Sequence, residues 1–175
     1  MGRYRKKPSQ YDSCLQLGSR GDEVVQKAAL IVVDTDVFVR DLRYVRDREY
    51  KTNRRFLETL RKEQNGTTTI VNLLELCGIL SFNLSPSQLK ELFFYFPRRY
   101  RIQVLPIHTM EKPLPEVEIG KLFERMAGKM SFGDALVAAF IEKFIPGADL
   151  FVSWNARHFQ TLKIPAVTPA QYLKR

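Results

Sequence analysis

The sequence predicts an α/β fold built around a parallel sheet, and two observations support this prediction. Short apolar segments alternate with longer segments that repeat apolar residues every three or four positions, as strands do with helices. The first apolar segment, residues 30–33, shows no polar alternation, which is typical of a strand covered on both faces. Parallel sheets bind ligands at the carboxyl ends of their strands, so polar residues there are candidates for function.

The other strands of this sheet are expected to be short. With residues 30–33 they make four to five strands, at residues 67–70, 102–105, 150–153 and 166–167. Helical segments lie between all of them except the last pair. Right-handed crossovers should therefore connect parallel strands.

Three helices carry specific start or stop signals. Residues 85–88 form a capping box with proline at the first helical position, and Pro97 is expected to end this helix. A second helix should open at Asn53 and close at residues 65–66. A third is expected over residues 119–126, where apolar residues recur at helical spacing.

The composition indicates one domain with an extension. The chain has 175 residues, 45% of them hydrophobic, which is enough to fill a core. Residues 1–28 lack convincing periodicity, so we interpret them as a basic N-terminal extension of a domain at residues 29–175. Two cysteines do not make a disulfide framework or a Cys/His zinc site. Every apolar run, residues 28–33 among them, is far short of the roughly 20 residues that span a bilayer, so a cytoplasmic protein is expected.

The charge distribution favours a polyanionic partner. Lys and Arg number 28 against 19 Asp and Glu, for a net charge of +9. Residues 40–62 interleave basic residues with Tyr44, Tyr50 and Phe56, and further basic groups surround Tyr100. Arginine with aromatic residues can neutralise phosphates and stack on bases. A solvated helix face that only supplies solubility explains the composition equally well.

Two acids follow or interrupt apolar segments. Asp34 comes directly after the first predicted strand, at a carboxyl end where parallel sheets bind ligands. Asp36 is interpreted as the cap of a helix beginning at Val37. Glu75 lies within residues 71–80, which are otherwise largely apolar, and a buried carboxylate there would need a partner, a cation or a cavity. The alternative is that Glu75 faces solvent on an open side of the helix.

Polar residues late in the chain can reach the same edge of the sheet. Asp134 lies in the first turn of an apolar helix, although Ser131 with Asp134 also matches an ordinary capping box. Asn155 follows the strand at residues 150–153, where turn chemistry alone could explain it. His108 and His158 lack neighbouring ligands at zinc spacing and are interpreted as structural or surface residues.

Taken in order, four segments of the chain resemble the PIN-domain nucleases, at residues 31–36, 73–76, 133–138 and 152–159. The resemblance spans residues 29–173. It implies a three-layer α/β/α fold with a central parallel sheet, whose acids hold Mg²⁺ or Mn²⁺ and cleave RNA. Many members of this family are VapC-type toxins held inactive by an antitoxin, so an antitoxin partner and a homodimer are also implied.

The resemblance assigns roles to particular residues. It places the metal-binding, catalytic acids at Asp34, Glu75 and Asp134, with Ser153 supporting Asp34 through a hydrogen bond. The fourth catalytic position is Asn155, where many members have Asp. Asp36 is a supporting residue at a position where Asn or Ser is frequent. The residues expected to bind RNA are Arg40, Arg43, Arg54, Arg55, Arg98 and Arg99.

Two alternative functions are kept open. In a phosphatase of the haloacid dehalogenase type, Asp34 would be a covalent nucleophile, because Asp-Thr-Asp after a strand has that form. Its serine strand would precede the last acidic motif, whereas Ser153 follows Asp134, and a clear lysine motif is absent from the sequence. A non-catalytic RNA-binding module is motivated by Asn155 and the basic surface.

Overall fold

The structure is a computed structural model that describes residues 29–107 and 109–175. The predicted extension, residues 1–28, lies outside the described residues. The described residues form one sheet of five parallel strands in the order β3-β2-β1-β4-β5. The strands are β1 (Ile31–Val33), β2 (Gly66–Thr69), β3 (Gln103–Leu105), β4 (Leu150–Val152) and β5 (Ala166–Val167).

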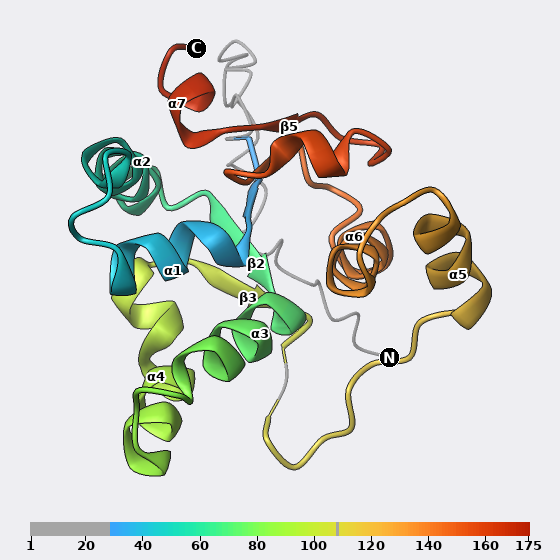
Figure 1. The fold of residues 1–175 in the computed structure, drawn as a ribbon, viewed down its shortest axis with the longest axis horizontal. Helices are drawn as coiled ribbons and strands as arrows, with labels where there is room; N and C mark the ends of the chain where they lie inside the picture. Colours follow the sequence, from blue (N-terminus) through green and yellow to red (C-terminus); the bar gives the residue numbers. More distant parts are fainter. Residues whose placement is uncertain (1–28, 108) are drawn as a thin grey trace, which may run out of the picture.

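Helices cover both faces of this sheet and make three layers. In Figure 1, α1, α2 and α4 lie on one side of the strands, and α5 and α6 lie on the other. The helices of the described chain are α1 (Thr35–Arg43), α2 (Tyr50–Glu63), α3 (Ile70–Leu80), α4 (Pro86–Tyr100), α5 (Ile119–Ala127), α6 (Phe132–Phe144) and α7 (Pro169–Tyr172), with a 3₁₀ turn η1 (Ala156–Phe159).

The buried core explains why the central strands read as continuous apolar runs. Val32, Val33 and Val152 are fully buried because helices pack on both faces of β1 and β4. Large aromatic side chains fill the layers between sheet and helices, among them Phe38, Phe56, Phe96, Phe140, Phe151 and Phe159. The α/β fold class and the parallel sheet are therefore confirmed.

One predicted helix end is wrong. Pro97 does not stop α4, which continues to Tyr100 and ends at Arg101 in the left-handed conformation (φ 53°). The ring of Phe38 lies 4.8 Å from Phe96 and 4.9 Å from Tyr100, measured between ring centres. Burial of the last turn of α4 outweighs the hydrogen bond that a proline nitrogen cannot donate.

Two predicted helix starts are also displaced. The first helix begins at Thr35 with Asp34 as its N-cap, two residues before the expected start at Val37. α2 begins at Tyr50, three residues before Asn53. Asn53 is instead fully buried: its Nδ2 donates to the carbonyl of Val37 at 2.9 Å, which ties α2 to α1.

In the part of the chain that the structure describes, no helix is both long enough and apolar enough to cross a membrane.

Candidate active site

Asp34 lies at the carboxyl end of β1, where the topology of the sheet predicts a site. Its backbone N–H donates to the carbonyl of Val152 at 3.0 Å, so it is held between β1 and β4. Its carboxylate accepts from the backbone N–H of Thr35 at 2.8 Å and so caps α1. The residue is only 7% exposed.

Asn72 and Thr35, which the sequence did not single out, hold Asp34 in place. Nδ2 of Asn72 donates to Asp34 Oδ1 and to Thr35 Oγ1, both at 3.0 Å. The other end of the amide is fixed, because Asn72 Oδ1 accepts from the hydroxyl of Thr69 at 2.6 Å in the capping box that starts α3. The cap therefore orients the N–H groups of Asn72 toward the acids.

Glu75 joins the same network from α3. The Thr35 hydroxyl donates to Glu75 Oε2 at 2.5 Å. Glu75 is exposed, as the sequence alternative of a residue facing solvent on an open side of the helix predicted. Its carboxylate nevertheless faces the other acids. A Cβ added to Gly133 would lie 3.7 Å from Glu75 Oε1, which places the start of α6 beside this carboxylate.

Asp36 does not cap a helix, contrary to the sequence interpretation. Its carboxylate accepts from the hydroxyl of Ser153 at 3.1 Å and from the backbone N–H groups of Trp154 and Asn155 at 3.2 and 3.1 Å. Asp36 thereby clamps the turn after β4 onto α1. The helix begins two residues earlier than expected, which turns Asp36 toward β4.

Arg40 and Trp154 stack beside this clamp. The guanidinium carbon of Arg40 lies 4.7 Å from the ring centre of Trp154, and Arg40 also forms an ion pair with Asp47. The indole N–H of Trp154 donates to Asn53 Oδ1 at 2.8 Å. Arg40 is thus a partly buried, ion-paired group near Asp36, and its role in RNA binding stays a prediction.

The environments of Asp34, which follows β1, and Asp36, in α1, disfavour their charged forms. Burial raises the pKa of Asp34 well above its usual range, and the charges of Asp36 and Glu75 raise it further, against hydrogen bonds from Ser153 and Thr35. Burial also raises the pKa of Asp36, while hydrogen bonds from the turn after β4 and the charge of Arg40 act against it. The Ser153 hydroxyl, which has one proton to donate, hydrogen-bonds Asp36 and also acts to lower the pKa of Asp34. Perturbed carboxylates gathered in one place are a feature of functional sites.

Asp134 reaches the same edge of the sheet from α6. Ser131 caps α6 by accepting from the backbone N–H of Asp134 at 3.1 Å, which is half of the predicted capping box. Asp134 Oδ2 lies 3.7 Å from Nδ1 of His158, a residue interpreted from the sequence as structural or surface. Its only sequence signal is its place three residues after Asn155.

The acids lie at the same edge of the sheet, but their carboxylates do not surround one common position. Among residues 29–107 and 109–175, no group of three or more His, Cys, Asp or Glu side chains is arranged to hold a metal ion. Asp34 and Glu75 are drawn together through Thr35, whereas Asp134 faces His158. Asn155 is exposed, and its contacts with the site are made by its backbone N–H.

The basic residues divide between different parts of the surface. Arg54 and Arg99 line one cavity, although they are far apart in the sequence. Arg55 instead lines a cavity with Ile31 and Asp149, at the amino ends of the strands and opposite the acids. The two remaining predicted RNA-binding residues are exposed; Arg43 donates to the carbonyl of Ile79, and Arg98 lies on α4.

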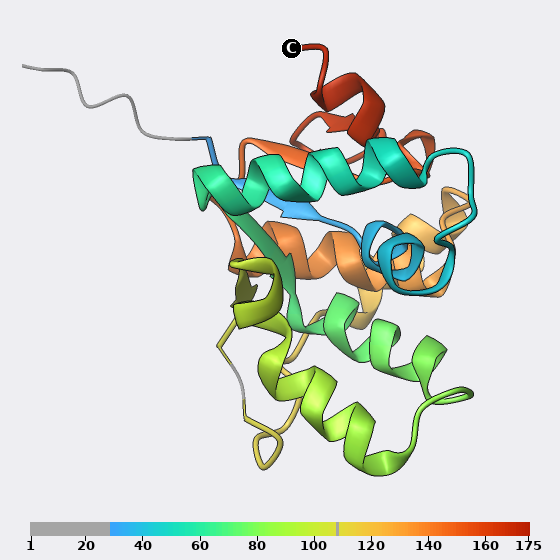
Figure 2. The same ribbon diagram turned by 90° about the vertical axis from the view of Figure 1, so that its left-hand side faces the viewer.

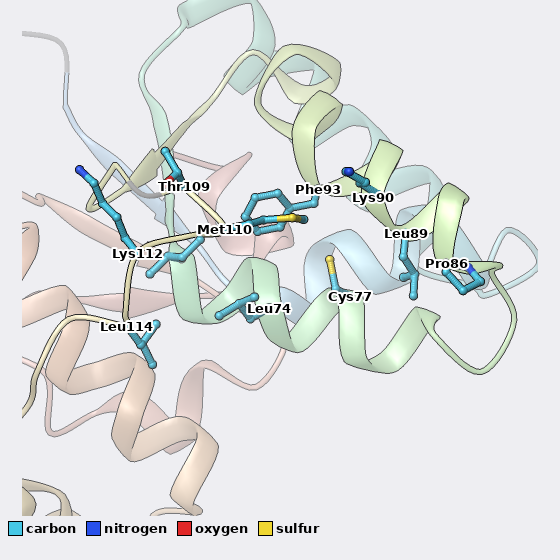
Figure 3. Close-up of a pocket in the computed structure, with 11 residues that line it drawn as sticks. Leu74, Cys77, Pro86, Leu89, Lys90, Phe93, Thr109, Met110, Lys112 and Leu114 are labelled. Atoms are coloured by element: carbon cyan, nitrogen blue, oxygen red, sulfur yellow. The ribbon is translucent and has the colours of Figure 1, made fainter.

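An apolar pocket of about 540 Å³ opens between α3, α4 and the loop that follows β3 (Figure 3). Leu74, Cys77, Phe93 and Met110 point into it, and the acids described above do not line it. Leu74 and Met110 are 45% and 49% exposed. Exposed apolar residues around a pocket are typical of surfaces that bind another molecule.

No protein-family model matches the sequence, and no curated protein matches it significantly. Solved structures do match. A chain from the structure of FitAB bound to an IR36 DNA fragment has 12% sequence identity and a TM-score of 0.51, over 81% of this chain and 96% of that one. A chain from the crystal structure of VapBC2 from Rickettsia felis, bound to a DNA fragment from their promoter, has 18% identity and a TM-score of 0.50, over 79% and 98%.

The fold and the acid-lined edge define a class of α/β/α protein with its site at the carboxyl ends of parallel strands. The structural likenesses narrow this class. The chain has the fold of the PIN-domain, VapC-like proteins, as the sequence resemblance predicted.

Proposed function

We propose that this protein is a metal-dependent endoribonuclease that hydrolyses RNA phosphodiester bonds. One observation carries the proposal: Asn72 and Thr35 hold the buried carboxylate of Asp34 beside Glu75 at the carboxyl end of β1. Holding unneutralised carboxylates together costs free energy, and a bound cation would offset that cost.

The donor set suits Mg²⁺ or Mn²⁺. Asp34, Glu75 and Asp134 offer only carboxylate oxygens, which hard cations prefer. Asp34 and Glu75 would hold the ion, and Asp134 would join them by turning away from His158. When bound, such an ion supplies an activated water and neutralises charge on the phosphate.

The protein's own groups keep this arrangement rigid. Thr35 donates to Glu75, and Asn72 donates to Asp34, so each acid has a fixed donor that leaves other carboxylate lone pairs free. Asp36 holds the turn after β4 through Ser153, which keeps that turn beside Asp34. Asp36 is therefore proposed as a positioning residue.

Cleavage assays test the proposal directly. Asp34→Asn, Glu75→Gln and Asp134→Asn should each reduce Mn²⁺-dependent cleavage of a mixed RNA substrate by at least about 100-fold, a typical effect of losing a key catalytic group. Glu124→Gln, which removes an exposed acid from α5, is the matched control and should cleave normally. Near-normal cleavage by any two of the three site variants, or by the wild type in excess chelator, would contradict the proposal.

A non-catalytic RNA-binding module is the second candidate. It is favoured by the finding that the described acids do not converge on a common cation position. The same assay separates the two candidates, because such a module would bind RNA in chelator and cleave none when Mn²⁺ is added.

We also infer a protein partner of the antitoxin kind. The neighbouring structures are those of FitAB and VapBC2 bound to DNA fragments, and the apolar pocket between α3 and α4 offers this chain a surface for such a partner. Lys90 and Lys112 line the pocket, so the partner segment should combine apolar and acidic side chains. Leu74→Lys should abolish inhibition by a cognate partner while leaving cleavage intact; unchanged inhibition would place the partner elsewhere.

Light scattering of the isolated chain tests the proposed homodimer.

A further inference from the structure

A second polar cavity lies where α1, α2 and α4 meet. Its volume is about 230 Å³. Figure 2 shows these helices on the face of the molecule turned toward the viewer. Three arginines line the cavity, from two helices, and the complete lining is Asp41, Arg54, Leu57, Glu58, Arg61, Arg99 and Tyr100.

The acids in this cavity do not neutralise its arginines. Three arginines face two acids, which leaves one unmatched positive charge in the lining. Arg54 lies 3.9 Å from Asp41 and 3.5 Å from Glu58, which are long ion pairs. Within residues 29–107 and 109–175, Arg61 and Arg99 form no ion pair.

Tyr100 gives the cavity a rigid wall. It is 7% exposed, and its hydroxyl donates to Asp41 Oδ2 at 2.9 Å. This bond occupies part of the carboxylate that would otherwise compete for the arginines. The guanidinium carbon of Arg99 lies 5.6 Å from the centre of the Tyr100 ring, so the aromatic face also restrains Arg99.

We propose that this cavity binds a phosphate group of the RNA strand. The inference rests on the proposed function, because it assigns a place to that substrate. Guanidinium groups match phosphate oxygens with paired N–H donors, and three arginines line this cavity. At about 230 Å³ the cavity is smaller than the roughly 300–1,000 Å³ of sites that enclose whole ligands, so it suits one charged group of a longer chain.

The position of the cavity suits a strand that continues to the acids. Asp34 caps the start of α1, and Asp41 lies seven residues further along the same helix. At 1.5 Å per residue this separates the two positions by about 10 Å. RNA held by the arginines would therefore present a neighbouring phosphodiester near the carboxyl end of β1.

Adjacent residues supply matched controls for this proposal. Arg54→Gln and Arg99→Gln remove arginines of the cavity, whereas Arg55→Gln and Arg98→Gln remove the same charge from outside it. Binding of fluorescently labelled single-stranded RNA is measured by anisotropy in chelator, across a series of salt concentrations. Thermal melts of all four variants confirm that they are folded.

Each cavity variant should weaken RNA binding about threefold to tenfold at low salt, as expected for one charge-assisted hydrogen bond at a partly exposed site. Each should also lower the slope of log affinity against log salt by about 0.7. The outer variants should change the slope by less than half as much. Equal effects of the cavity variants and the variants outside the cavity would overturn the proposal. DNA of the same sequence carries the same phosphates, so an effect seen with RNA but not with DNA would also overturn it.

A change of opposite sign gives an independent test. Glu58→Gln should strengthen RNA binding about twofold to threefold, because it releases Arg54 from its acidic neighbour. Glu124→Gln removes an acid from α5, at the far side of the molecule in Figure 1, and should change binding less. Equal gains would contradict the assignment. Binding is measured in chelator and does not depend on cleavage. If the variants change RNA binding as expected but the protein never cleaves RNA, the proposed nuclease function is refuted and the proposed phosphate site is supported.

Discussion

Asn72→Asp should destabilise the metal-free protein through repulsion between two carboxylates. The amide Nδ2 of Asn72 lies 3.0 Å from Asp34 Oδ1, and the substitution replaces this donor with a carboxylate oxygen. For charge centres about 4 Å apart and an effective dielectric constant of about 20, the repulsion is about 4 kcal/mol. The lost hydrogen bond to a charged acceptor adds about 1.5–3 kcal/mol.

The control is Asn72→Ala, which loses the same donor without adding charge. Both variants keep the backbone N–H of residue 72, which donates to Thr69 Oγ1 at 3.1 Å. The side-chain oxygen that accepts from the Thr69 hydroxyl is kept in Asn72→Asp and lost in Asn72→Ala, and this hydrogen bond is worth about 1 kcal/mol. The difference in stability between the variants is therefore the repulsion less this hydrogen bond, at most about 3 kcal/mol, because the folded pair can take up a proton instead.

The destabilisation should depend on pH in one direction. In Asn72→Asp the folded pair has a carboxyl pKa above the unfolded value of about 3.9. Stability is then retained near the unfolded pKa and lost as the pH rises through the folded pKa. Urea unfolding in chelator at pH 5 and pH 8 measures this loss for both variants. The reasoning is refuted if Asn72→Asp is no less stable than Asn72→Ala at pH 8, or if their difference is the same at both pH values.

Three further predictions concern stability and metal dependence. Because burial raises the pKa of Asp34, Asp34→Asn should stabilise the metal-free protein at pH 7 by about 1–3 kcal/mol in urea unfolding, with the gain shrinking as the pH falls toward 4; a loss of stability would contradict this. Gly66→Ala should lower the free energy of unfolding by about 1–3 kcal/mol in thermal melts, because its Cβ would lie 2.7 Å from Ile102 Cγ2. Gly78→Ala, whose Cβ would have nothing within 4 Å, should raise it by about 0.5–1 kcal/mol. Equal melting temperatures would refute the packing argument. Asn155→Asp adds a carboxylate near the proposed site and should lower the Mn²⁺ concentration for half-maximal cleavage. An unchanged Mn²⁺ requirement would contradict this and show that position 155 lies beyond the reach of the metal.

Local signals in the sequence predicted most of the fold. The continuous apolar run at β1 and the capping box at Ser85 have direct physical causes within a few residues. Pro97 shows the limit of this reasoning. Whether a helix continues past a proline depends on what its next turn buries, and Phe38, which packs on Tyr100, comes from a distant segment.

The candidate site was predictable only in part. The rule that ligands bind at the carboxyl ends of strands leads to Asp34 from the sequence alone. The role of Asn72 was not predictable, because its spacing from Thr69 explains it fully as a cap, and only the folded chain places its free N–H groups on Asp34. Asp36 was misinterpreted because a shift of two residues in the helix start changes which side chain faces β4.

Basic residues that are neighbours in the sequence lie on different parts of the surface. Arg54 and Arg55 are adjacent, yet successive residues point about 100° apart around a helix. Arg54 faces the cavity shared with Arg99, whereas Arg55 faces the opposite end of the sheet. A charge cluster in the sequence is therefore a poor guide to a charge cluster on the surface.

The two ends of α1 lie near opposite charges: acids at its start, and the arginines of the cavity, which come from α2 and α4, toward its end. Acids at the start of the helix repel a phosphate strand, and the Asn72 amide and the Thr35 backbone N–H, which hold Asp34, offset little of that repulsion. The arginine cavity, about 10 Å along the helix, attracts the same strand without entering the acidic edge. Binding in the cavity should therefore not require a cation, whereas approach of a phosphodiester to Asp34 and Glu75 should require one. RNA affinity measured in chelator should accordingly survive Asp34→Asn and fall with Arg99→Gln, and the reverse ranking would show that the strand is held at the acids themselves.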